Sequence, residues 1–304
     1  MMRDLNLYIV YNRLVNLMVR AGVNKRFGRK GQILLNRIDL ALRKKFNKNS
    51  APNPCIFEGI TIHYPRNGFG GNIYMAGKYE PETTKLIREL CYPGIHFVDV
   101  GGNIGYFTLI VATDIRDNAG DGVVYSFEPN PALFSILKQN LAANRLEGIV
   151  KPVQKAVSNS RQSVKLFIEQ IDGLTSSTLE ALSVGWDALI CESVTLDSFF
   201  AKENWPVIDL IKIDVEGAEV GVLQGMKELN ARNPKLKLIL EFSPRYLQAA
   251  GITAESFFDL LLSMEFRQFH VISNERSPLQ IPEEISLLHK RYENSHVNLL
   301  CEKT

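Results

Sequence analysis

The sequence predicts a doubly wound α/β domain, and two observations support this prediction. From Pro81 onward, short apolar runs alternate with amphipathic stretches of helical length, as in a mostly parallel sheet with helices on both faces. The last two apolar runs have no full helix between them, which indicates that the final strand runs antiparallel to the others.

Residues 1–50 are expected to form a basic helical extension that precedes a domain over residues 51–304. Apolar residues from Leu7 to Met18 recur at helical spacing. The extension holds twelve Lys or Arg and two Asp or Glu, whereas the rest of the chain holds 23 and 31. Such a leader suits an anionic membrane surface, nucleic acid or an acidic protein patch. A solvated helical extension is the favoured interpretation, and peripheral contact with a membrane or protein partner stays open.

The elements of the domain follow one another in a regular order. A pair of short strands is expected within residues 55–64, and Pro81 is a typical first residue of a helix that ends at Leu90. Seven further runs predict the main sheet, namely 96–100, 123–127, 149–157, 208–215, 236–242, 266–272 and 296–301. Shorter strands are expected at 164–168 and 193–196, and helices at 103–113, 131–144, 218–229 and 254–264.

Cysteine usage and hydropathy predict a cytoplasmic protein. The four cysteines are far apart and form no CxxC pair, so neither a zinc site nor a redox motif is indicated. Widely spaced thiols suit a reducing compartment. The apolar stretch at residues 5–19 is interrupted by Asn12, Arg13 and Asn16, so it is neither a signal peptide nor a membrane span.

The run that follows the first main strand has the composition of a ligand-binding turn. Sheets of this kind bind ligands at the carboxyl ends of their strands. Here Asp99 precedes Gly101, Gly102, Asn103 and Gly105, and glycines let a backbone turn sharply beside a ligand. The turn is not the GxGxxG fingerprint that holds a dinucleotide pyrophosphate. An aspartate before it repels phosphate and attracts a cation such as the amino or sulfonium group of S-adenosylmethionine.

A second acidic residue follows the next strand at the spacing of one βαβ unit. Glu128 lies 29 residues after Asp99 and can accept hydrogen bonds from both ribose hydroxyls of an adenosyl group. The alternative is that Glu128 is only a favourable charge at a helix N-terminus.

The fourth strand ends in a cluster of charges. Asp214, Glu216 and Glu219 follow it, and Lys212 lies inside its apolar run. Buried charges are costly unless they are paired or functional, so the cluster is either part of a site or a structural ion-pair network.

Three of these runs together carry a family resemblance. They are Phe97-Val-Asp-Val-Gly-Gly-Asn-Ile-Gly-Tyr-Phe, Phe127-Glu-Pro-Asn and Asp209-Leu-Ile-Lys-Ile-Asp-Val-Glu-Gly-Ala-Glu. Over about residues 70–245 the chain resembles the FkbM family of methyltransferases. The resemblance implies a Rossmann-like fold whose last strand is antiparallel, and S-adenosylmethionine as methyl donor. It also implies O-methylation of a hydroxyl, often on a sugar or a polyketide.

The resemblance also implies which residues form the donor site. The loop after the first strand is expected at the methionine end of the donor, Glu128 at the ribose, and the end of the third strand near adenine. Asp214 and Glu216 are expected to face the transferred methyl group, and Glu80 to close on the donor. The implied donor-binding residues are Glu80, Asp99, Gly101, Asn103, Gly105, Tyr106, Glu128, Ala156, Val157, Ser158 and Asp214.

An alcohol is a weak nucleophile at neutral pH, so a general base is expected beside the methyl group. The candidates are Asp214, Glu216 and Glu241, which all lie at neighbouring strand ends. A divalent metal on Asp214 and Glu241 is a less favoured alternative, because no histidine accompanies them. His63 and His270 could reach this edge but are more often structural.

Three other functions predict different features. A nicotinamide oxidoreductase requires the GxGxxG turn, and a nucleic-acid base methyltransferase requires an Asn/Asp-Pro-Pro-aromatic motif after the fourth strand. A binding module that uses the basic leader predicts salt-dependent affinity for nucleic acid or lipid. We therefore expect no nucleic-acid partner, and an acceptor that is a small molecule or glycan, such as a sugar, glycolipid, polysaccharide or polyketide-like compound. Its lid is expected from residues 170–188 and from the leader.

Overall fold

The computed structural model describes residues 54–65, 79–169, 176–183, 185–273 and 275–303. These residues belong to one compact unit, Pro54–Thr304. The predicted basic extension lies outside the described residues, as does part of the expected lid. No helix among the described residues is both long and apolar enough to cross a membrane.

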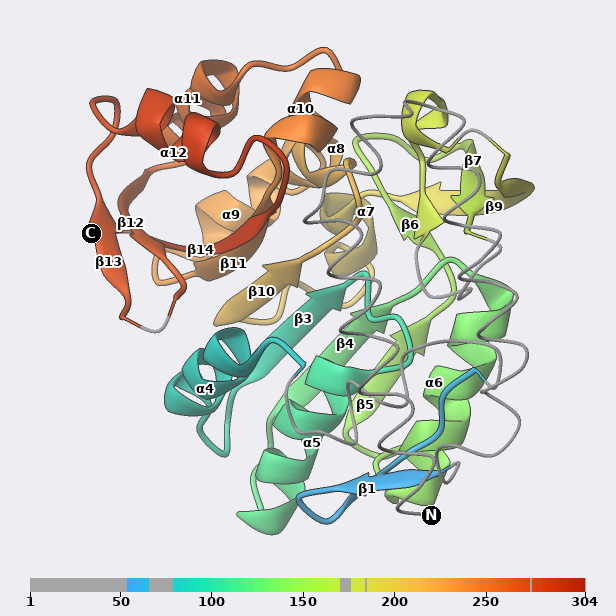
Figure 1. The fold of residues 1–304 in the computed structure, drawn as a ribbon. Coiled ribbons are helices and arrows are strands. Elements are labelled where there is room, and N and C mark those ends of the chain that lie inside the picture. Colours follow the sequence, from blue (N-terminus) through green and yellow to red (C-terminus); the bar gives the residue numbers. More distant parts are fainter. Residues whose placement is uncertain (1–53, 66–78, 170–175, 184, 274, 304) are drawn as a thin grey trace, which may run out of the picture. The chain divides into compact units, whose positions relative to one another are not determined.

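The central sheet confirms the predicted fold class. Its strands are β3 (His96–Val100), β4 (Val123–Phe127), β5 (Val150–Val153), β10 (Leu210–Ile213), β11 (Lys237–Phe242), β12 (Phe266–Val271), β13 (Ser277–Leu279) and β14 (Val297–Lys303). They lie in the order β13-β12-β14-β11-β10-β3-β4-β5 (Figure 1). The run from β11 to β5 is parallel, and β14 is antiparallel to both β11 and β12, as predicted for the last strand.

The sheet has eight strands where the sequence predicts seven. The additional strand, β13, is three residues long and pairs with β12 at the edge of the sheet. Its sequence, Ser-Pro-Leu, has no alternating pattern, and proline is tolerated at a sheet edge because no inner ladder bond is lost there.

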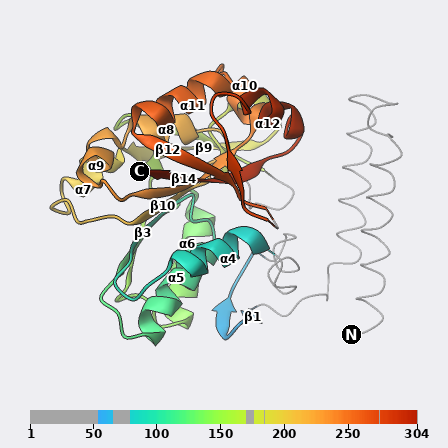
Figure 2. The ribbon, with the colours of Figure 1, turned by 90° about the vertical axis from the view of Figure 1, so that its left-hand side faces the viewer.

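Helices cover both faces of the sheet, which is the meaning of a doubly wound fold. One face carries α4 (Pro81–Leu90), α5 (Tyr106–Asp117) and α6 (Pro131–Ala143) (Figure 2). The other carries α8 (Glu219–Gln224), α9 (Lys227–Arg232), α10 (Pro244–Ala249), α11 (Ala254–Ser263) and α12 (Ile285–Arg291). The short α7 (Leu196–Phe200) packs against α9.

Two smaller groups of strands complete the domain. The predicted strand pair near residue 55 is confirmed as the hairpin β1 (Cys55–Phe57) and β2 (Ile60–Ile62). A second sheet has the order β6-β9-β7-β8. Its strands are β6 (Ala156–Val157), β7 (Ser163–Ile168), β8 (Ser176–Ser177) and β9 (Asp187–Val194), with a 3-10 turn at Glu180–Leu182.

The single strand predicted over residues 149–157 is wrong, because the chain changes sheets within it. β5 ends at Val153, and the N–H of Lys155 turns back to the Val153 carbonyl. The following β6 pairs with β9 in the smaller sheet instead of continuing beside β4.

The single helix predicted over residues 218–229 is also divided in two. α8 ends at Gly225, whose backbone approaches the Ser158 carbonyl so closely that any Cβ would overlap it. α9 then starts at Lys227. Close packing against the strand on this face therefore overrides the helical periodicity of the sequence.

Local helix signals are confirmed where the sequence indicates them. Pro81 begins α4, and the Thr253 hydroxyl caps α11 by accepting the Ser256 N–H at 3.1 Å. α5 starts at Tyr106, three residues later than predicted, because Gly105 before it has a φ of 96°.

Candidate functional site

The carboxyl ends of three neighbouring strands meet at one edge of the sheet. Val100 of β3 is in register with Phe127 of β4 on one side and with Ile213 of β10 on the other. The chain reverses its direction of travel across the sheet at β3, and such switch points are where doubly wound sheets bind ligands. The residues that follow the three strands therefore lie side by side.

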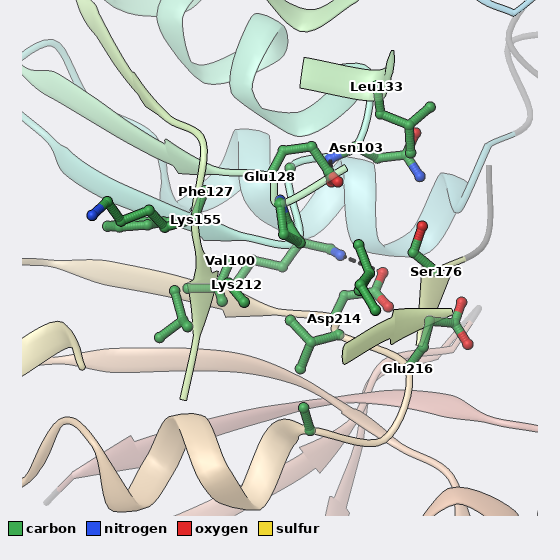
Figure 3. Close-up of a pocket in the computed structure, with 18 of the residues that line it drawn as sticks. Val100, Asn103, Phe127, Glu128, Leu133, Lys155, Ser176, Lys212, Asp214 and Glu216 are labelled. Atoms are coloured by element: carbon green, nitrogen blue, oxygen red, sulfur yellow. Dashed lines mark hydrogen bonds and ion pairs between the residues drawn. The ribbon is translucent and has the colours of Figure 1, made fainter. Parts of the chain in front are cut away.

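A pocket of about 880 Å³, partly open to solvent, occupies this edge. Figure 3 shows Asn103 and Glu128 on one side of it, and Asp214 and Glu216 on the other. Eight of the residues implied by the family resemblance line it, namely Gly101, Asn103, Tyr106, Glu128, Ala156, Val157, Asp214 and Glu216. The predicted residues Glu80, Asp99, Gly105, Ser158 and Glu241 are not among the lining residues.

Glu128 is a buried carboxyl group held by the backbone. Its two oxygens accept the N–H groups of Asn103 and Asn130, each at 2.8 Å. Only 4% of the residue is exposed. Burial raises its pKa to about 7, and the two backbone hydrogen bonds act in the opposite direction. Each oxygen keeps further lone pairs that can accept hydrogen bonds from a ligand.

The glycine turn after β3 is required by the protein's own packing. A Cβ at Gly101 would overlap the backbone carbonyl of Asp214, and a Cβ at Gly102 would overlap the Ser126 hydroxyl. The N–H groups of both glycines donate to the Phe127 carbonyl, at 3.0 and 2.9 Å. The glycines thus bring three strand ends together, so the protein's own packing is sufficient to require them.

Two of the predicted donor-binding residues, Gly105 and Ser158, have packing contacts of their own. Gly105 has a φ of 96°, and a Cβ there would overlap the Leu137 side chain of α6. Ser158 lies behind β6, where its carbonyl packs against Gly225. Both follow a strand end in the sequence, and that position alone does not tell which way the chain then turns.

Asp99 lies beneath the glycine turn and not in the pocket wall. It is 1% exposed, and its Oδ2 accepts the Thr108 hydroxyl at 2.6 Å. Its Oδ1 has no hydrogen-bond partner among the described residues. Burial raises the pKa of Asp99, although the Lys212 ammonium opposes this. Asp99 therefore supports the turn from behind.

Lys212, Asp214 and Glu241 form a buried ion-pair network. The Lys212 Nζ lies 2.7 Å from the Asp214 Oδ2 and 4.7 Å from the centre of the Phe107 ring. Burial raises the pKa of Asp214, but Lys212 and a hydrogen bond with Glu241 outweigh it, and the pKa is lowered. Burial and the Asp214 charge raise the pKa of Glu241 well above its ordinary value. The two shifts are opposite in direction, so Glu241 holds its proton more strongly than Asp214 does.

Glu216 lines the pocket as Glu128 does, and no Lys, Arg or His of the described residues forms an ion pair with it. Burial, followed by the charge of Asp214, raises its pKa to about 7. Its φ of 54° is in the left-handed region, which non-glycine residues adopt rarely and often at functional sites.

Glu80 is tied to the last strand behind the pocket. Its Oε2 accepts the side-chain N–H of Asn298 at 2.6 Å, and the same amide donates to the Thr83 hydroxyl at 3.0 Å. Burial raises the pKa of Glu80. The neighbouring Tyr79 lines the pocket and packs edge-on against Tyr106, with ring centroids 5.0 Å apart.

The remaining pocket residues could not be found from the sequence. They come from the first turns of α5 and α6, from loops and from the smaller sheet, and no periodicity in the sequence marks them as pocket residues. They include Phe107, Leu133, Lys155, Leu166, Ser176 and Thr178. Tyr246, which donates a hydrogen bond to Glu216, was also missed. The one available signal was that its helix directly follows the end of β11.

Neither of the two histidines considered from the sequence reaches the pocket. The His63 ring lies 3.2 Å from the Gln139 amide, and the His270 ring lies 3.9 Å from Glu302. Within the described ranges, no group of three or more His, Cys, Asp or Glu is arranged to hold a metal ion.

Comparison with known proteins identifies the family. The model of the methyltransferase FkbM domain matches residues 99–271, which is more than half of the chain. Hexuronic acid methyltransferase AglP of Haloferax volcanii is 30% identical over 147 residues, which cover 48% of this chain and 56% of that protein. Methyltransferase 1 of Beauveria bassiana is 32% identical over 168 residues, covering 47% and 66%. The chain thus spans less than two thirds of the length of these relatives.

Solved methyltransferase structures also match. M. jannaschii TYW2 in complex with AdoMet is 12% identical, with a TM-score of 0.40 over 84% of this chain and 90% of that one, and we draw nothing further from an overlap of this size. The domain match confirms the resemblance found in the sequence and, with it, S-adenosylmethionine as the cofactor, so the chain belongs to the family of methyltransferases defined by the FkbM domain.

Proposed function

We propose that this protein transfers the methyl group of S-adenosylmethionine to a hydroxyl group of a sugar, glycan, glycolipid or polyketide-like acceptor. The observation that carries the proposal is that one pocket holds both Glu128 and Glu216. The first is suited to bind a nucleoside, and the second is suited to take a proton near neutral pH.

The residues of the pocket fit the donor. Glu128 presents two carboxylate oxygens, as a ribose with two neighbouring hydroxyls requires. Ala156 and Val157 offer an apolar surface for the adenine, and Asn103 and Tyr106 border the space for the methionine part. When bound, S-adenosylmethionine supplies a methyl carbon on a positively charged sulfur, which keeps the electron pair of the broken carbon–sulfur bond.

Asp214 and Glu241 act on this site without serving as the base. Asp214 lies beside Lys212 and has a lowered pKa, so it binds a proton weakly. Its charge, stabilised by the lysine and by a hydrogen bond with Glu241, favours a cation in the pocket. Glu241 is a positioning residue for Asp214, since it does not reach the pocket wall.

Glu216 is the base in this proposal. As the acceptor oxygen forms its bond to the methyl carbon, the hydroxyl proton moves to the Glu216 carboxylate. A base is most effective when its pKa lies near the working pH, as the pKa of Glu216 does. The pKa of Asp214 is lowered, and Glu241 does not line the pocket. Most of the acceleration is expected from alignment of the reacting atoms and exclusion of water by the aromatic wall around Tyr79, Tyr106 and Phe107.

A sugar acceptor is supported by the name of one relative. AglP is called a hexuronic acid methyltransferase, at 30% identity over part of both chains. Hydroxyl chemistry is supported separately, because a carboxylate with a pKa of about 7 can deprotonate an alcohol as it reacts, whereas a neutral amine needs no such base.

The proposal is tested by incubating the full chain with methyl-labelled S-adenosylmethionine and a panel of sugars and glycolipids. Each hydroxylated compound is paired with a control whose hydroxyls are blocked. We expect label only in the unblocked compounds, with loss of transfer in Glu216→Gln and retained affinity of that variant for S-adenosylhomocysteine. Transfer to nitrogen or carbon, or undiminished transfer by Glu216→Gln, would refute the proposed chemistry.

A further inference from the structure

Tyr246 lies at the site without being part of the pocket wall. It belongs to α10, which begins two residues after β11 ends, and it is half-buried. Its hydroxyl donates a hydrogen bond to the Oε2 of Glu216. This bond engages Oε2 and leaves the other oxygen of the carboxylate available to an acceptor.

The backbone of Glu216 is already fixed by three other groups. The Ser177 hydroxyl donates to the Glu216 carbonyl at 2.7 Å. The Oε1 of Glu219 accepts the N–H of Gly217 at 3.1 Å, and the Leu179 side chain occupies the space where a Cβ of Gly217 would lie. These contacts fix the backbone at Glu216 and Gly217, so the remaining motion is rotation of the Glu216 side chain. The hydrogen bond from Tyr246 removes that freedom.

The electrostatic surroundings give the same hydrogen bond a second effect. Burial and the carboxyl groups of Asp214, Glu219 and Glu169 raise the pKa of Glu216. The carboxyl group of Glu241 lies at the neighbouring strand end. Lys212 is paired with Asp214 and offsets part of this charge. The Tyr246 hydroxyl acts in the opposite direction, since it lowers the pKa of Glu216. Burial and the Glu216 charge raise the pKa of Tyr246, so it remains a donor at every pH of interest.

We propose that Tyr246 is the positioning residue of the base, because its hydroxyl aims the Glu216 carboxylate into the pocket and keeps it ionised among neighbouring acids. This inference rests on the proposed function, which makes Glu216 the base. It adds a residue from a helix outside the pocket wall to the reaction. It also explains how a half-buried acid in an acidic cluster stays usable near neutral pH.

The test compares the titration of Glu216 in the wild type and in Tyr246→Phe. The full chain is labelled at its glutamate carboxyl carbons, and the Glu216 signal is identified by its loss in Glu216→Gln. A charge-assisted hydrogen bond is worth enough to predict a midpoint about one pH unit higher in Tyr246→Phe, a roughly tenfold change in the ionisation constant. Tyr125→Phe, which removes a hydroxyl elsewhere in the sheet, should leave the midpoint unchanged.

Turnover gives a second measurement. In Tyr246→Phe the acid limb of the kcat profile should move to higher pH by the same amount, with little change in the acceptor KM or in the affinity for S-adenosylhomocysteine. If Tyr246→Phe does not fold, 3-fluorotyrosine in place of tyrosine makes the hydroxyl a stronger donor without changing its shape, and the Glu216 midpoint should fall.

The outcomes separate this inference from the proposed function. A Glu216 midpoint that stays the same in Tyr246→Phe, or that does not fall with 3-fluorotyrosine, overturns the role of Tyr246 and leaves the methyl transfer standing. A wild-type chain that methylates no hydroxyl of any acceptor refutes the proposed function, whatever the titration gives.

Discussion

The affinity of the pocket for S-adenosylhomocysteine should depend on pH through Glu128. The ribose hydroxyls donate to this carboxyl group, so the ionised form binds better. Its pKa is about 7 in the free protein because the group is buried. Bound hydroxyls stabilise the ionised form and lower the pKa of Glu128 in the complex below its value in the free protein. The affinity is therefore full above pH 7 and falls as the pH drops below it.

The size of the effect follows from the ionised fraction. If only ionised Glu128 binds, the dissociation constant rises about 30-fold between pH 8 and pH 5.5, or about 2 kcal/mol. Near pH 6, binding should release almost one proton. In Glu128→Gln, one oxygen must serve both backbone N–H groups and the ribose. Affinity at pH 8 should therefore fall about ten- to a hundredfold, and the dependence on pH should disappear.

Isothermal titration calorimetry between pH 5.5 and 8.5, in buffers of different ionisation enthalpy, measures both the affinity and the proton release. Glu216→Gln is the matched control, because Glu216 also titrates near pH 7 in the same pocket and should leave the slope unchanged. Circular dichroism checks that each variant is folded. A flat affinity in the wild type, or the same slope in Glu128→Gln, would show that Glu128 does not bind the ribose.

Three further predictions concern the scaffold of the site. Gly102→Ala should destabilise the fold by about 1–3 kcal/mol in urea unfolding, since its Cβ overlaps the Ser126 hydroxyl, and adding Ser126→Ala should recover much of the loss. Lys212→Met should cost about 3–5 kcal/mol at pH 8, because the half-buried Asp214 is left with a charge that no cation compensates; a smaller loss at low pH, where Asp214 can take up a proton, is the expected signature in thermal melts. Thr253→Ala should cost about 1 kcal/mol through loss of the α11 cap, with Thr253→Ser close to the wild type and S-adenosylhomocysteine affinity the same in both; a changed affinity would mean that α11 reaches the site.

The central strands could be predicted from the sequence because their burial is continuous. The bounds predicted for 96–100 and 123–127 are those of β3 and β4, whose residues are almost all buried. The smaller sheet lacks this property, since β9 alternates between exposed and half-buried residues over most of its length. The strand predicted at 193–196 therefore covers only the last two residues of β9, 193 and 194, and extends wrongly into α7.

The residues of the candidate site could also be predicted only in part. The order of residues along the chain shows which of them follow a parallel strand. Glu128, Asp214 and Glu216 could therefore be predicted to share one edge of the sheet, and they line one pocket. Whether such a residue turns toward the pocket depends on the loop after the strand. Ser158 follows a strand end as closely as Glu128 does, yet it packs against Gly225, and Gly105, in the turn after β3, packs against Leu137.

The three candidate bases are alike in sequence, and only their partners distinguish them. Asp214 forms an ion pair with the lysine two residues before it, and its pKa is lowered. Burial and the charge of Asp214 raise the pKa of Glu241. Glu216 meets a tyrosine thirty residues further along, whose position depends on the end of β11 and the start of α10. A carboxyl group acquires its pKa from groups brought to it by the fold, so the sequence could indicate an acidic site but not assign the base within it.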